Sequence, residues 1–203
     1  MIPETPWKDN GLTNQTKKEI IEKHFAIIME TLGLDLSDDS LCDTPKRVAK
    51  MYVEEVFWGL RPENLPKMTV IDNKMKYDEM VTEVNITLNS NCEHHFIPII
   101  GKAHVSYIPK DKVIGLSKLN RLVDYYARRP QVQERLTDQI AEHLKELLGT
   151  DDVAVVIDAM HTCVRTRGIK DSASHTRTSS IHGQYRKPET RAELFNSIPK
   201  FEI

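Results

Sequence analysis

Hydrophobic residues recur at helical spacing in the N-terminal third of the chain. After a polar tail over residues 1–13, the apolar positions of residues 14–33 fall every three or four residues, which predicts an amphipathic helix that ends at Gly33. Those apolar positions are Ile20, Ile21, Phe25, Ile28 and Leu32. The run from Asp43 to Gly59 predicts a second helix, because Pro45 suits a first helical position.

From residue 81 the apolar period changes to two, which predicts β-strands. The first strand places Val84, Ile86 and Leu88 on one face, and Asn85, Thr87 and Asn89 on the other. Further strands are predicted at residues 101–109, 153–158 and 172–182, and helices at 117–128, at 131–148 and within 187–203. Strands that flank a consecutive pair of helices indicate an α+β domain with an antiparallel sheet.

Composition excludes several classes of protein. The 203 residues carry 28 Lys and Arg against 30 Asp and Glu, and 28 − 30 gives a net charge of −2. A near-neutral chain gives no reason to expect nucleic acid or an anionic membrane as a partner. No apolar run approaches the roughly 18 residues of a membrane span, and the first residues lack a signal-peptide pattern. We therefore expect a cytoplasmic protein whose three cysteines are ligands or free thiols.

Cysteine and histidine gather at two places where predicted strands end. Cys92, His94 and His95 follow the first strand, and His161 and Cys163 follow the strand at 153–158. Cys92 and His95 are three residues apart, so both can reach one metal ion from a turn. His161 and Cys163 are two apart and point the same way in extended backbone. Mixed sulfur and nitrogen donors of this kind favour zinc.

The spacing alone leaves the choice of ligands open. Four of these five side chains would make a closed structural site, whereas three would leave a position for water, as in catalytic zinc sites. Neither group contains the Cys-x-x-Cys pair that is typical of structural sites. Neighbouring cations also indicate an anionic ligand, which a structural zinc site does not need.

Candidate anion-binding residues lie close in sequence to both groups. They are Ser117, Lys118 and Arg121 at the start of one predicted helix, and Arg165, Arg167 and Lys170 after Cys163. A helix start accompanied by Lys and Arg favours anions, and an Arg side chain donates two parallel bonds to phosphate. The alternative for each is an ordinary solvated charge.

Gln133 and Glu134 open the next predicted helix. A carboxylate at this place often only complements the helix dipole. The two oxygens of Glu134 also match the adjacent ring and exocyclic N–H groups of a guanine edge.

Together these segments resemble the type I GTP cyclohydrolase family. The matching strings are DTPKRVAKMY, CEHHF, GKAHVSYIP, IGLSKLNRLVDYYARRPQVQERLT and HTCVRTRG, which cover residues 40–185 almost without gaps. The resemblance implies an α+β tunnelling fold, a four-stranded antiparallel sheet with two helices on one face. That fold would span residues 76–203, after an N-terminal helical extension of residues 1–75. The chain departs from the family in SASHTRTSS, where His175 and Arg177 interrupt a stretch that is Thr-rich in many bacterial members.

The resemblance also implies an activity and a site. Family members convert GTP and water to formate and dihydroneopterin triphosphate, the first step of folate and pterin biosynthesis. They use Zn2+ and form decamers of two pentamers with active sites between subunits. The implied zinc ligands are Cys92, His95 and Cys163, and the implied catalytic residues are His94, His161 and Ser117. The implied substrate contacts are Gln133, Glu134, Lys118, Arg121, Arg167 and Arg47.

Two other classes of protein stay open at the level of sequence. One is another tunnelling-fold enzyme that acts on a pterin or a deazapurine. Among these, the pterin synthases bind zinc through three histidines at a spacing this chain lacks, and the nitrile reductases use a catalytic Cys without zinc. The other is a non-enzymatic nucleotide-binding or structural zinc protein, which would have a closed metal shell and release no formate from GTP.

Overall fold

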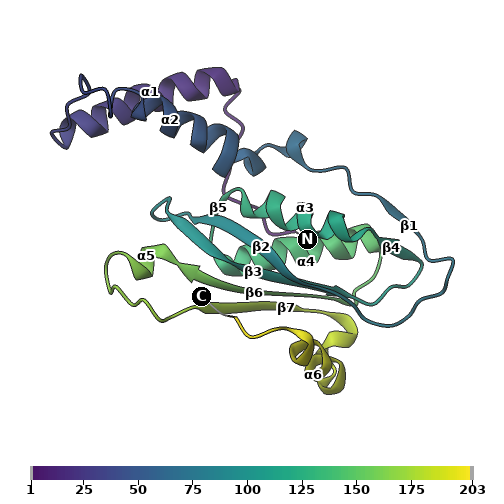
Figure 1. Cartoon of the computed structure of the whole chain (residues 1–203). Coiled ribbons are helices and arrows are strands. Elements are labelled where there is room, and N and C mark those ends of the chain that lie inside the picture. Colours follow the sequence, from purple (N-terminus) through teal and green to yellow (C-terminus); the bar gives the residue numbers. More distant parts are fainter. Residues whose placement is uncertain (1, 202–203) are drawn as a thin grey trace.

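A five-stranded sheet organises most of the chain in the computed structural model, which describes residues 2–201 (Figure 1). Its strands are β2 (Val81–Cys92), β3 (Pro98–Tyr107), β5 (Pro130–Gln131), β6 (Val153–His161) and β7 (Thr176–Ile181), in the order β5-β2-β3-β6-β7. Strands β2, β3, β6 and β7 pair antiparallel, and β5 pairs parallel with β2. The four expected antiparallel strands are present. The expectation of a four-stranded sheet is wrong, because the short strand β5 adds a fifth.

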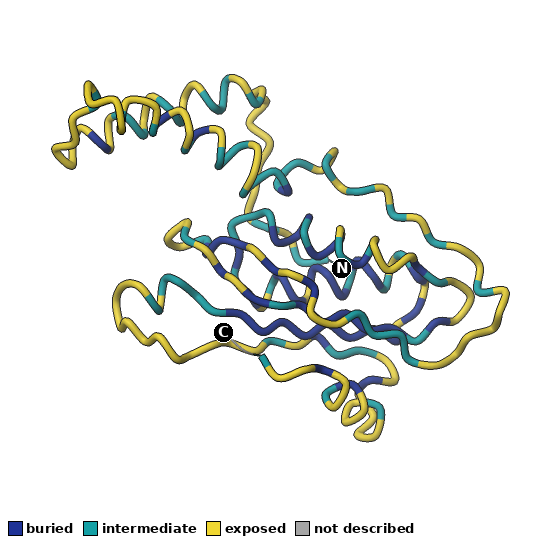
Figure 2. Tube along the Cα trace, in the orientation of Figure 1, coloured by how far each residue is buried: buried dark blue, intermediate teal, exposed yellow. Residues whose placement is uncertain are grey.

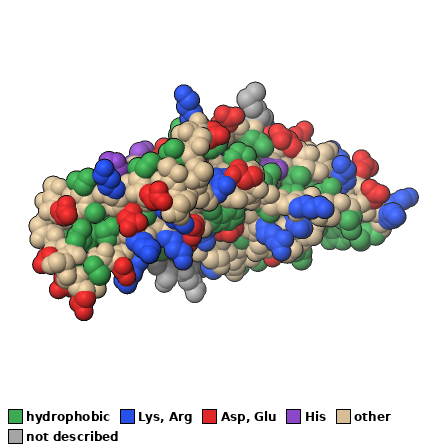
Figure 3. Space-filling model, turned by 90° about the horizontal axis from the view of Figure 1, so that it is seen from above, with side chains coloured by type: hydrophobic (Ala, Val, Ile, Leu, Met, Phe, Trp, Pro, Cys, Tyr) green, Lys and Arg blue, Asp and Glu red, His purple; other side chains and the backbone are tan. Residues whose placement is uncertain are grey.

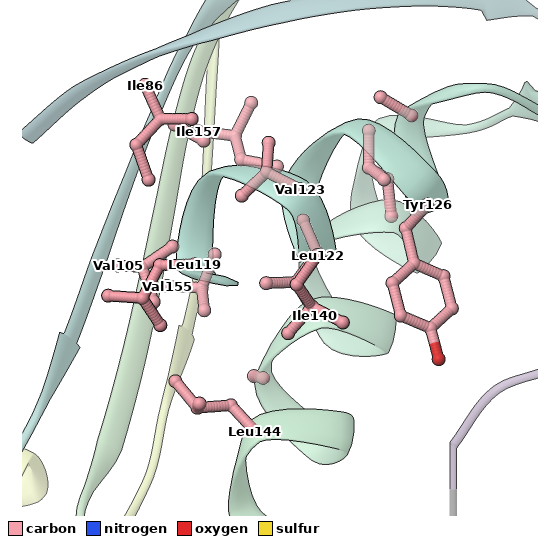
Figure 4. Packing of buried hydrophobic residues seen from close by; sticks show 14 of the residues in the cluster. Ile86, Val105, Leu119, Leu122, Val123, Tyr126, Ile140, Leu144, Val155 and Ile157 are labelled. Carbon is pink, nitrogen blue, oxygen red and sulfur yellow. The ribbon is translucent and has the colours of Figure 1, made fainter. Parts of the chain in front are cut away.

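Two helices, α3 (Leu116–Ala127) and α4 (Gln133–Leu148), cover one face of the sheet. Figure 4 shows Leu119, Leu122 and Ile140 from these helices packed with Val105 and Val155 from the strands. All five side chains have no exposed surface. Burying one such side chain contributes about 1.5–3 kcal/mol to folding, so this layer supplies the main core beneath the site.

The opposite face of the sheet is covered at one end. The turn η4 (Gly183–Arg186) and helix α6 (Pro188–Ser197) place Tyr185 and Leu194 against Ala154 and Val156 in a second, smaller core. The Tyr185 hydroxyl lies 2.6 Å from the Ser106 hydroxyl, which satisfies both buried groups. The predicted helix near residue 187 is confirmed.

The N-terminal region forms a helical hairpin that stands apart from the sheet (Figures 1 and 2). It consists of α1 (Asn14–Thr31), capped by the Thr13 side chain, and α2 (Thr44–Lys50). Within one chain its apolar stripe is not covered, because Ile28 and Leu32 are 50% and 73% exposed. Hydrophobic side chains reach the surface at the left of Figure 3, among acidic and basic ones.

The predicted helix from Asp43 to Gly59 is confirmed as far as Val56, but it is an α-helix only to Lys50. The chain continues as a wider π-helical turn, η1 (Met51–Val56), and two 3-10 turns, η2 (Trp58–Leu60) and η3 (Pro62–Asn64). Gly59 is buried because the chain passes close to the end of α3. A Cβ atom there would lie 2.1 Å from the carbonyl oxygen of Tyr125, so the glycine permits this approach rather than ending a helix.

The regular alternation predicted for β2 is broken near its start. The pairing with β3 shifts register between Glu83 and Ile86, and Asn85 has a φ of 59°. The Asn85 N–H donates to Nδ1 of buried His104 at 3.3 Å. This β-bulge turns Val84 outward, whereas Ile86 and Leu88 keep the predicted buried face.

Smaller differences concern the edges of the domain. Strands β1 (Val70–Asp72) and β4 (Lys112–Ile114), which the sequence analysis did not predict, form a separate two-stranded sheet. β7 begins at Thr176 rather than residue 172. Within residues 2–201 no helix is long and apolar enough to cross a membrane. The division into residues 1–75 and 76–203 stays a prediction.

Candidate metal centre and active site

Three side chains from the two separate Cys/His groups converge at one end of the sheet. Their ligand atoms, from Cys92, His95 and Cys163, all lie within 4.8 Å of one another. Cys92 is buried at the end of β2, His95 lies in the following turn, and Cys163 lies in α5 (Thr162–Arg165), directly after β6. Because β2 and β6 both border β3, the sheet brings together residues about seventy positions apart in the chain.

The turn after β2 is held by backbone bonds. The Cys92 N–H donates to Ile97 O at 2.9 Å, and the Phe96 N–H donates to Cys92 O at 2.8 Å. The Glu93 N–H donates to Gln131 O at 3.0 Å, which extends the β5 pairing into the turn. The unexpected strand β5 therefore fixes the backbone from which Cys92 and His95 project.

The arrangement around Cys163 differs from the expected one. His161 ends β6, but Thr162–Arg165 form a helical turn, so the extended backbone assumed for His161 and Cys163 is wrong. The Thr162 hydroxyl donates to Pro98 O at 2.6 Å and anchors this turn to β3. The turn directs Cys163 towards Cys92 while His161 occupies a different place.

The donor chemistry of the converging group fits a metal ion. Burial and the neighbouring Cys92 thiol raise the pKa of Cys163. Metal binding would deprotonate such thiols, because the thiolate is the form that acts as a ligand. All three cysteines of the chain are free. Two thiolates and one imidazole make three protein ligands, which suits a tetrahedral ion with one position left open.

The two neighbouring histidines lie beside this group but not within it. His94 Nδ1 is 3.7 Å from Cys92 Sγ, and its side chain is 65% exposed. His161 Nε2 is 2.8 Å from Gln133 Oε1. The geometry thus separates a Cys-His-Cys set from the two neighbouring imidazoles of His94 and His161.

Gln133 is buried, and both ends of its side-chain amide are hydrogen-bonded within the protein. Its amide nitrogen lies 3.0 Å from Ile157 O, 3.0 Å from Thr176 O and 3.1 Å from Thr178 Oγ1, and so acts as the donor. The amide oxygen is left to accept from His161. Burial lowers the pKa of His161, and the Glu134 carboxylate acts in the opposite direction. His161 is therefore a neutral imidazole with its proton on Nε2 and Nδ1 available.

Comparison with known proteins gives a consistent result. The family model described as GTP cyclohydrolase I matches residues 21–199. A relative named GTP cyclohydrolase 1 from Aeromonas salmonicida is 59% identical over 196 residues, 96% of this chain and 90% of the relative. Relatives of the same name are 58% identical in Aeromonas hydrophila, over 97% of this chain and 91% of the relative, and 57% identical in Yersinia enterocolitica, over 96% and 89%.

The chain belongs to the GTP cyclohydrolase I family. It is an enzyme of mixed α/β architecture, and it contains a Cys-His-Cys group that can hold a metal ion. Within this family, the remaining expected site residues fall into a near set and a remote set.

The near set comprises Glu134 and Arg167. Glu134 is exposed on the first turn of α4, where its charge acts on His161. Arg167 is exposed, and its Nη1 lies 2.6 Å from His95 Nε2. Arg167 thus lies beside the Cys-His-Cys group, whereas Glu134 lies within electrostatic reach of His161.

The remote set is not joined to the Cys-His-Cys group by any hydrogen bond or ion pair within residues 2–201. Ser117, Lys118 and Arg121 occupy the start of α3, as expected. Asn120, in the same stretch, lies 3.4 Å from Glu83 near the beginning of β2, at the opposite end of that strand from Cys92. Arg47 lies on α2, where it pairs with Asp43 at 3.5 Å.

Sequence reasoning missed one pair of residues at the site. The Arg135 guanidinium donates to the Glu93 carboxylate, and both side chains are largely buried. Both lie in strings that resemble the family, CEHHF and PQVQERLT, but their separation of 42 positions in the chain concealed the contact.

Proposed function

We propose that the chain catalyses the hydrolysis and rearrangement of GTP to formate and 7,8-dihydroneopterin triphosphate, the first step of folate and pterin biosynthesis. The observation that carries this proposal is the convergence of Cys92, His95 and Cys163 beside His94 and His161 in a member of this family. The free state of all three cysteines agrees with action in the reducing cytoplasm.

Zinc is the proposed metal, held by Cys92, His95 and Cys163. Two sulfurs and one nitrogen suit its borderline-soft character better than that of magnesium or calcium, which prefer oxygen. When bound, zinc supplies Lewis acidity for attack of water on carbon 8 of the purine.

The two histidines carry the proton transfers in this proposal. His161 presents Nδ1 to the substrate, because Gln133 accepts from Nε2–H. Nδ1 first takes up a proton from solvent and then gives it to nitrogen 7 of the purine. His94 is 65% exposed, and we assign it the proton transfers that accompany opening of the imidazole ring and departure of formate. Ser117 assists the later rearrangement of the ribose.

Charge and hydrogen bonding set the orientation of GTP. Glu134 accepts from the guanine N–H groups, while Lys118, Arg121, Arg167 and Arg47 bind the triphosphate. Arg167 Nη1 lies 2.6 Å from His95 Nε2, so its guanidinium is already beside the proposed metal ligands.

The remote set supports active sites shared between chains. About nine strand residues separate Glu83 from Cys92, roughly 30 Å at 3.3 Å each. The start of α3 lies beside Glu83, so its cations cannot reach the metal group of the same chain. A site that uses both must take them from two copies. We therefore propose that tunnelling-fold subunits assemble into a decamer of two pentamers, with the exposed stripe of α1 as one covered surface.

The proposed function is tested by incubating the purified chain with GTP. Formate is measured directly, and the oxidised neopterin product is measured by its fluorescence, with and without a zinc chelator. Formation of both products at a one-to-one ratio, abolished by the chelator and restored by zinc, supports the proposal. Formate release without a pterin product, or turnover that is insensitive to metal removal, contradicts it.

A further inference from the structure

The Glu93 side chain lies between a fixed cation and one of the two histidines. One carboxylate oxygen, Oε2, accepts from Nη2 of Arg135. The other, Oε1, lies 3.8 Å from His94 Nε2. Glu93 is 24% exposed and Arg135 is 16% exposed, whereas His94 is 65% exposed. The carboxylate thus connects the interior of the domain to an imidazole that faces solvent.

Arg135 is itself held in place by buried groups. Its Nε donates to Gln131 Oε1 at 3.1 Å, and its Nη2 also lies 3.4 Å from Pro130 O. Gln131 has no exposed surface, and its amide nitrogen donates to Gln139 Oε1 at 2.8 Å and to Tyr126 O at 2.9 Å. Because that nitrogen has two acceptors, the Gln131 oxygen must point to Arg135.

The same chain of bonds continues to the N-terminal arm. The Gln139 amide nitrogen donates to Pro3 O at 2.6 Å and to Thr5 Oγ1 at 3.1 Å. The side-chain donor groups of Gln139, Gln131 and Arg135 are therefore each fixed in one orientation. The Arg135 guanidinium, fixed in this way, holds the Glu93 carboxylate in a position that the buried groups determine rather than the solvent.

We infer that Arg135 and Glu93 are positioning residues for His94. This inference rests on the proposed function, in which His94 transfers protons. A carboxylate facing Nε2 favours the tautomer that carries its proton there, and it limits rotation of the ring. Nδ1 is then kept on the side of Cys92 and the metal group. Neither Arg135 nor Glu93 touches the reacting atoms.

A double-mutant cycle on assembled, zinc-loaded enzyme tests the inference. The variants are Glu93→Gln, which keeps the shape and removes the charge, Arg135→Met, which keeps the length and removes the fork, and the double variant. We expect kcat to fall about 10–100-fold in each single variant, the range seen when an outer partner of a functional side chain is lost, with KM for GTP changed less than twofold. The double variant should be no slower than the worse single one, because the two residues act as a unit.

Controls separate positioning from general damage. Arg128→Met removes a comparable ion pair, to Asp124 on α3, and should leave kcat unchanged. Arg135→Lys keeps the charge and should recover part of the loss. Bound zinc per chain and the melting temperature are measured for every variant. Losses that multiply in the double variant, or that follow zinc content or melting temperature, overturn the inference.

A measurement that does not depend on turnover distinguishes failure of this inference from failure of the proposed function. Solid-state spectra of the 15N-histidine-labelled enzyme report the tautomer of His94, whose signals are identified by their loss in His94→Asn. We expect the proton on Nε2 in the native enzyme and a mixture of tautomers in Glu93→Gln. If the native enzyme releases no formate but shows this tautomer change, the proposed function fails and the positioning stands. An unchanged tautomer overturns the positioning whatever the activity.

Discussion

His161 and Gln133 form a 2.8 Å hydrogen bond in which the imidazole must be the donor. The direction follows from the far end of the glutamine amide, whose nitrogen is occupied by acceptors on β6 and β7. Gln133 was expected from the family resemblance to contact the substrate. Its burial and its bonds instead favour a role in holding His161 with Nδ1 free.

Replacing Gln133 tests this relationship. Gln133→Leu leaves the His161 Nε2–H and the carbonyls of Ile157 and Thr176 without their partner, so stability should fall by about 1–3 kcal/mol per unpaired buried group. Formate release should fall at least tenfold, because the ring loses its orientation. Urea unfolding and the formate assay measure the two effects. Thr137→Val removes the hydroxyl bonds to Thr178 Oγ1 and to the backbone carbonyl of Gln133 but leaves the Gln133 side chain in place, and it should leave the rate within twofold. Full activity of Gln133→Leu would show that His161 needs no partner at Nε2.

Shared active sites predict complementation between inactive chains. Lys118→Ala and His161→Ala should each be inactive alone, since each removes one half of every site. When the two chains are co-expressed and assemble at random, about half of the sites receive an intact Lys118 and, independently, about half receive an intact His161. About a quarter of the sites then have both, so about a quarter of the native activity should return. Mixing after separate assembly provides the control. If co-expression restores nothing, the two residues act from the same chain.

We expect replacement of Cys163 and replacement of Cys42 to have different effects on the zinc content of the protein. Cys163→Ala should lose most of its bound zinc, because two remaining ligands hold the ion poorly. Cys42→Ala should keep a full complement, since Cys42 is exposed and lies outside the converging group. Metal analysis after dialysis measures both. Retention of zinc by Cys163→Ala would remove that residue from the shell.

Stability should decline with acid because of His143. Burial lowers its pKa, while its Nδ1 lies 2.7 Å from the Tyr126 hydroxyl. The unfolded chain takes up a proton near pH 6.5, whereas the folded one resists until lower pH. Stability conferred by neutral His143 is therefore present above about pH 6.5 and is lost as the pH falls below it, by up to about 1.4 kcal/mol per pH unit.

Urea unfolding between pH 7.5 and 5.5, at fixed protein concentration, measures this decline. His143→Gln should show a shallower slope than the native chain. His24→Gln provides the reference for removing an exposed histidine from α1. Equal slopes for the native chain and His143→Gln would assign the acid sensitivity to other groups, such as His104, whose pKa burial also lowers.

Much of the secondary structure and the chemistry is written in local sequence. Periodicity located α3, α4 and the antiparallel strands within a few residues, because one face of each element must be buried. Local patterns also drew attention to Cys92, His95 and Cys163, since thiols and imidazoles at strand ends are uncommon and chemically specific. They failed at Val84 and after Val56, where the buried His104 and the close approach at Gly59 override local preference.

Only the tertiary structure decided which side chains act together. Spacing left five candidate ligands, and the pairing of β2 and β6 with β3 selected three of them. The family resemblance placed Gln133 near a substrate, whereas its contacts tie it to His161. The bond between Arg135 and Glu93 had no local signal at all. The sequence by itself determined the elements and the kinds of chemistry, because these depend on neighbouring residues. Distances between side chains depend on strand order and helix packing, which bring residues far apart in the chain into contact.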